Sequence, residues 1–124
     1  MLKIGLSAES TTVVTDTNTA LTLGSGDMNV FATPAMVALM ENAAMRAVAA
    51  ALPEGSTTVG TAMQTSHTKA SKMGAKITAS AHLTEIDGRR LCFEVKAWDE
   101  AGTIGEGTHT RFVVDRERFL AKLG

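Results

Sequence analysis

One long apolar segment, residues 34–52, constrains this chain more than any other feature, because a change of hydrophobic period follows it. Apolar side chains cover most of the helical circumference of this segment, which predicts a helix that other elements have to bury. From residue 57 onward the period changes from 3.6 to 2, as is typical of strands with one buried face. This order predicts an α+β domain in which a curved antiparallel sheet wraps around one helix.

Local signals place the other elements. Residues 6–16 are expected to form a strand, and residues 17–29 a loop with one short helical turn. Thr33-Pro34 has the character of a helix start, with the helix ending near Ala51. Four strands and a short helix are then expected over residues 57–66, 77–84, 90–99, 103–114 and 116–123. A tight turn at Asp87-Gly88 joins the middle strands.

Composition limits the partners and the compartment. A chain of 124 residues with 44% hydrophobic and 20% charged residues fits one domain over residues 1–124. Its formal net charge of −1 provides no positive field for nucleic acid or anionic lipid. Glu41 and Arg46 interrupt the apolar segment, so we expect no membrane span. With no signal-peptide pattern and a single cysteine, Cys92, a cytoplasmic protein is expected.

Two features of the predicted fold concern association and chemistry. A sheet of this kind leaves edge strands, and pairing between two copies would protect them, so a homodimer is expected. Glu41 falls on the helix face of Val37, Ala44 and Val48, turned away from solvent. A carboxylate there costs desolvation energy unless a partner satisfies it, and such sites are often functional. The alternative is a carboxylate at the edge of the apolar face, bonded to a neighbouring strand.

Thr33 and the histidines allow more than one interpretation. A threonine before proline at a helix start usually caps the helix, although it could be a nucleophile. His67 lies among hydroxyl side chains after a strand, where a neutral imidazole could act as a base, or it could be an ordinary surface residue. His82 lies on the polar face of its strand and is expected to be exposed.

His109 shares a strand face with two glycines and Arg111, which fits close approach of another segment but indicates no specific role. The three histidines lack the spacing of metal ligands, so we expect no metal site.

Several of these weak signals occur together in one order. The motifs are Val30-Phe31-Ala32-Thr33, Glu41, Val59-Gly60-Thr61, Thr65-Ser66-His67-Thr68 and Gly105-Glu106-Gly107-Thr108-His109-Thr110-Arg111. This set resembles the small hotdog-fold thioesterases of the fluoroacetyl-CoA thioesterase-like family, over most of the chain from Val13 to the last helix. The resemblance implies a hotdog fold and hydrolysis of a short or small acyl-CoA thioester. Coenzyme A would be part of the substrate, with no other cofactor.

The resemblance also implies roles by position. Thr33, Glu41 and His67 match the family's catalytic residues, Gly60 the glycine near the thioester carbonyl, and Arg111 the arginine associated with that glycine. Water or Thr33 would attack the carbonyl, with His67 as base and Glu41 as an orienting or activating group. One alternative is a non-catalytic protein that binds acyl-CoA or another small ligand. Another is a hydratase or dehydratase, whose Asn-Pro-x-His motif this sequence lacks.

Overall fold

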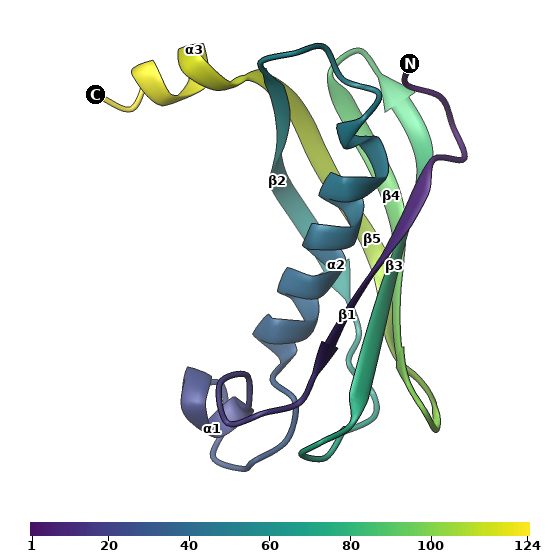
Figure 1. Ribbon diagram of the computed structural model, residues 1–124, viewed down its shortest axis with the longest axis vertical. Helices are drawn as coiled ribbons and strands as arrows, with labels where there is room; N and C mark the ends of the chain where they lie inside the picture. Colours follow the sequence, from purple (N-terminus) through teal and green to yellow (C-terminus); the bar gives the residue numbers. More distant parts are fainter.

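The chain forms one antiparallel sheet curled around one helix, the predicted α+β architecture (Figure 1). The computed structural model describes residues 1–124. Its elements are β1 (Ser7–Val13), α1 (Ala20–Leu23), α2 (Thr33–Ala49), β2 (Ser56–Thr65), β3 (Lys76–Asp87), β4 (Arg90–Asp99), β5 (Gly102–Asp115) and α3 (Arg116–Ala121). The strand order in the sheet is β1-β3-β4-β5-β2, so β1 and β2 are the edges.

The core lies between α2 and the concave face of the sheet. Met36, Met40 and Val48 are buried on one side of α2. They belong to a cluster of 17 buried hydrophobic residues that also contains alternate residues of β3 and β4. The period-2 pattern therefore correctly indicated which faces of β3 and β4 are buried. No helix in the structure has both the length and the hydropathy that crossing a membrane requires.

The start of α2 corrects one expectation from the sequence. Thr33 is the first helical residue, and the N-cap is Ala32, which provides no side-chain hydrogen bond. Pro34 follows in the first turn, where amide groups have no intrahelical partner and proline is tolerated. Thr33 therefore does not cap the helix, and its hydroxyl is available for another contact.

The end of β2 passes very close to β5 at two glycines. A Cβ atom at Gly107 would overlap the carbonyl oxygen of Gln64, and one at Gly105 would overlap that of Ser66. Beyond this point the Thr68 amide donates to the Ile104 carbonyl at 2.8 Å. The two glycines thus let the chain after β2 lie against β5 and reach the first turn of α2.

We expect Gly107→Ala to lower the free energy of unfolding by about 1–3 kcal/mol, the usual cost of forcing extra volume into a packed site. Gly88→Asn is the matched control, because Gly88 has a φ of 60° and open space around it, and asparagine tolerates this conformation. Urea denaturation of the variants at one protein concentration measures both effects. Equal stability of the Gly107→Ala variant and the parent chain would contradict the close approach.

Candidate active site

Thr33 and His67 form a hydrogen-bonded pair where the first turn of α2 meets the segment after β2. The Oγ1 atom of Thr33 lies 2.7 Å from Nδ1 of His67. Thr33 is exposed and His67 is half-buried. The edge of the Phe31 ring faces the imidazole, with 6.5 Å between the ring centroids and 75° between the planes. The structure therefore brings together two of the three residues to which the resemblance assigns catalysis.

The surroundings of His67 favour a neutral imidazole. Burial lowers the pKa of His67, and this effect outweighs the backbone of Lys69, which raises it. The Nε2 atom is buried and has no hydrogen-bond partner. With its proton on this inward-facing Nε2, a neutral imidazole can accept the hydrogen of the Thr33 hydroxyl at Nδ1. Such a pair is suited to activating a hydroxyl group or a water molecule near neutral pH.

A small cavity of about 220 Å³ lies beside this pair. Its walls include α1 residue Ala20, the apolar Val30 and Phe31 before α2, and both Thr33 and His67. Pockets for drug-sized ligands usually measure about 300–1,000 Å³. The cavity is therefore suited to a small group, which it would place next to the Thr33 hydroxyl.

Glu41 belongs to a second cluster, in the middle of α2. Its Oε2 atom lies 3.8 Å from Nη1 of Arg111, and its side chain is 41% exposed. A Cβ atom at Gly60 would lie 2.8 Å from this Oε2 atom, so a larger residue there would require the carboxylate to move. The expectation that Glu41 faces away from solvent is thus corrected. It lies at the edge of the buried face, where both β5 and solvent reach it.

Arg111 has a fixed orientation in this cluster. Its Nε donates to Oγ1 of Thr58 at 2.8 Å, and its Nη2 donates to the Thr58 carbonyl at 2.9 Å. Burial lowers the pKa of Arg111 and the charge of Glu41 raises it. Because an arginine side chain stays protonated in proteins, the guanidinium places a fixed positive charge beside Glu41.

The two clusters are separate within one chain. Thr33 and Glu41 are a little more than two turns apart on α2, about 12 Å along its axis. One cluster holds Thr33 and His67, and the other holds Glu41, Gly60 and Arg111. The second cluster also contains His109, whose Nε2 lies 3.2 Å from Nη1 of Arg111. No role for His109 could be predicted from the sequence, although the strand face that it shares with Arg111 was the available signal. His82 is exposed, as expected.

Comparisons with a family model and with a curated relative point to the same family. The family model described as fluoroacetyl-CoA-specific thioesterase matches residues 14–117. The fluoroacetyl-CoA thioesterase of Streptantibioticus cattleyicolor is 46% identical over 94 residues, which are 76% of this chain and 68% of that protein.

Two solved structures extend the comparison. A crystal structure of a mutant fluoroacetyl-CoA-specific thioesterase in complex with fluoroacetate and CoA is 37% identical, with a TM-score of 0.89 over 95% of this chain and 99% of that one. A hot-dog-like protein from Thermanaerovibrio acidaminovorans is 22% identical, with a TM-score of 0.87 over 97% of this chain and 89% of that one, and shows the shared fold. The chain has the hotdog fold and belongs to the fluoroacetyl-CoA-specific thioesterase family.

Proposed function

We propose that this protein hydrolyses a short acyl-CoA thioester to a free acid and CoA, with Thr33, His67 and Glu41 as its catalytic residues. The 2.7 Å hydrogen bond between Thr33 and His67 beside a small cavity carries the proposal. The complex of a related thioesterase with fluoroacetate and CoA supports the same substrate class. This chemistry needs no cofactor besides the CoA of the substrate. The free thiol of Cys92 fits the reducing cytoplasm, where we place the protein.

The chemistry begins at Thr33. His67 takes a proton at Nδ1 from the Thr33 hydroxyl, or from a water molecule that Thr33 holds, and the freed oxygen attacks the thioester carbonyl. The uncapped start of α2 leaves backbone amides without partners, and these favour the negative charge that develops on the carbonyl oxygen. Collapse of the tetrahedral intermediate breaks the carbon–sulfur bond, and protonated His67 returns its proton to the departing thiolate. If Thr33 becomes acylated, water attacks the acyl group by the same route.

Glu41 cannot join this pair within one chain, and we propose that a second copy supplies it in a homodimer. The helix rise keeps Glu41 about 12 Å along α2 from Thr33. A partner subunit that packs along α2 would place its own Glu41 beside the Thr33 and His67 of the first subunit. The acyl pocket would then lie at the subunit interface.

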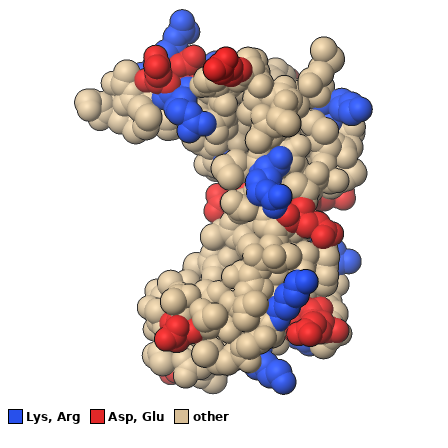
Figure 2. Space-filling view, viewed as in Figure 1, with Lys and Arg blue, Asp and Glu red and all other residues tan.

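The edge of the molecule that contains β2 and α2 is suited to such packing. It is hollowed between α3 at one end and α1 at the other (Figure 2). α2 exposes Pro34, Ala38 and Met45, and β2 is an edge strand that pairs only with β5.

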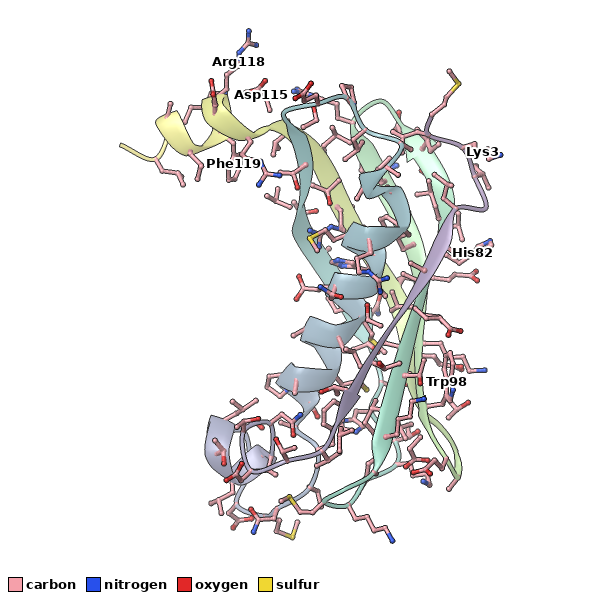
Figure 3. All side chains as sticks on the ribbon, viewed as in Figure 1. Lys3, His82, Trp98, Asp115, Arg118 and Phe119 are labelled. Carbon is pink, nitrogen blue, oxygen red and sulfur yellow. The ribbon has the colours of Figure 1, made fainter.

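At the end of this hollow, α3 extends away from the sheet and exposes Phe119 and Leu120. Phe119 points back toward the hollow, whereas Arg118 points away from it (Figure 3). An apolar side chain in this position could contact a second copy that fills the hollow.

A thiol-release assay across acyl-CoA esters of increasing length tests the proposed function. We expect turnover of short acyl groups and a steep loss with longer ones, because the cavity beside Thr33 has about 220 Å³. Isothermal titration calorimetry with the same esters measures their binding, for comparison with the rate of thiol release. Binding without any thiol release would contradict hydrolysis and favour the non-catalytic binding protein.

Thr33→Ala tests the role of the hydroxyl. We expect kcat to fall by about 10²–10⁴-fold, the range for loss of a group that acts in proton transfer. Thr33→Ser keeps a hydroxyl and should retain part of the turnover. Thr33→Ala removes no cap bond but does remove the hydrogen bond to His67, so the free energy of unfolding should fall by only about 0.5–1.5 kcal/mol.

Mass spectrometry after rapid quenching completes this test. An acyl group on Thr33 would identify it as the nucleophile, and its absence would assign the attack to water. Full turnover in a folded Thr33→Ala variant would remove Thr33 from the mechanism.

A further inference from the structure

His109 is a buried histidine with a hydrogen-bond neighbour on each ring nitrogen. Its side chain lies on the helix-facing side of β5, and the residue is 2% exposed. Nδ1 lies 2.7 Å from the carbonyl oxygen of Ala62, and Nε2 lies 3.2 Å from Nη1 of Arg111. His109 thus connects β2 to the guanidinium that faces Glu41.

The two neighbours determine where the proton of His109 lies. A carbonyl oxygen only accepts hydrogen bonds, so Nδ1 carries the proton, and a guanidinium only donates, so Nε2 is the acceptor. Burial lowers the pKa of His109, and the charge of Arg111 lowers it further. These effects exceed the opposing contributions of the Ala62 backbone and of Glu41. The imidazole of His109 is therefore neutral, and its Nε2 accepts a hydrogen bond from Arg111.

The bond to Ala62 is made at an irregular point of β2. The pairing of β2 with β5 shifts between Gly60 and Ala62, so Thr61 is an extra residue in the edge strand. A Cβ atom at Gly60 would lie 3.1 Å from Cε1 of His109. The imidazole therefore packs against the same glycine that makes room for Glu41.

The gap between Arg111 and Glu41 is wider than a direct charge-assisted hydrogen bond. Their closest atoms are 3.8 Å apart, whereas such bonds between nitrogen and carboxylate oxygen measure about 2.7–2.9 Å. Nη1 of Arg111 has two possible acceptors within reach, Nε2 of His109 and the carboxylate of Glu41. In the structure it lies closer to His109.

We propose that His109 is a positioning residue: it accepts a hydrogen bond from Nη1 of Arg111, the nitrogen that the two bonds to Thr58 leave free, and so prevents this nitrogen from closing on Glu41. The carboxylate is then left free to act on the substrate. This inference rests on the proposed function, because it assigns the free carboxylate to thioester hydrolysis.

Two substitutions separate the two ring nitrogens. His109→Gln can place its carbonyl oxygen, an acceptor, near the position of Nε2. His109→Asn can place its NH2 donor near the position of Nδ1, but its side chain is too short to bring an acceptor to the position of Nε2. For His109→Asn we expect kcat to fall about 10–100-fold, as for small misplacements of catalytic groups, with little change in KM. Its crystal structure should show Arg111 and Glu41 in direct contact. His109→Gln should restore both the separation and most of the turnover.

His82→Asn is the control, because His82 lies on the outer face of the sheet, away from α2 (Figure 3). This substitution should change neither kcat nor the distance between Arg111 and Glu41. Loss of kcat in His109→Asn without closure of Arg111 on Glu41 would overturn the proposal, and so would closure without loss of kcat. Failure of the parent chain to hydrolyse any acyl-CoA would contradict the proposed function instead. Even then, the distance between Arg111 and Glu41 in the variants would show whether the hydrogen bond to His109 keeps Arg111 away from Glu41.

Discussion

The packing of α2 into the concave face of the sheet fixes the position of every group in the candidate site. Met36, Met40 and Val48 anchor the helix in the core, so its first turn and its middle are held at a constant separation. The first turn meets His67, and the middle meets Gly60 and Arg111. Because a helix rises by only 1.5 Å per residue, no side-chain rotation brings Glu41 to Thr33. The proposed catalytic set, which uses both residues, therefore calls for two copies of the chain.

β2 runs from the cluster around Glu41 toward the pair of Thr33 and His67, and its irregular positions shape both. Near Glu41 the strand contains an extra residue next to Gly60, and the absence of a side chain at Gly60 leaves room for the carboxylate. Farther along, the close approach to Gly107 directs the following segment toward α2, where His67 meets Thr33. Side chains at either glycine would displace one cluster or the other. The edge position of β2 also leaves its backbone available to a partner subunit.

Much of the fold could be predicted from the sequence, because hydrophobic period reports burial directly. The strand over residues 90–99 matches β4 (Arg90–Asp99), and the helix expected from residue 116 matches the start of α3 (Arg116–Ala121). The site was less predictable, since it depends on contacts between distant segments. The sequence left Thr33 open between a helix cap and a nucleophile, and in the structure its hydroxyl bonds to His67. The partial exposure of Glu41 and the bonds of His109 depend on how β2 and β5 approach α2, which no local pattern records.

Subunit complementation tests the shared site most directly. Glu41→Gln and His67→Ala should each lower turnover by about 10²–10⁴-fold as pure homodimers. After the two variants are refolded together in equal amounts, each mixed dimer would contain one site with both defects and one intact site. We expect the mixture to recover roughly a quarter of the parent activity, because random pairing makes about half of the dimers mixed. A mixture that stays inactive, although native mass spectrometry shows mixed dimers, would contradict a site built from two subunits.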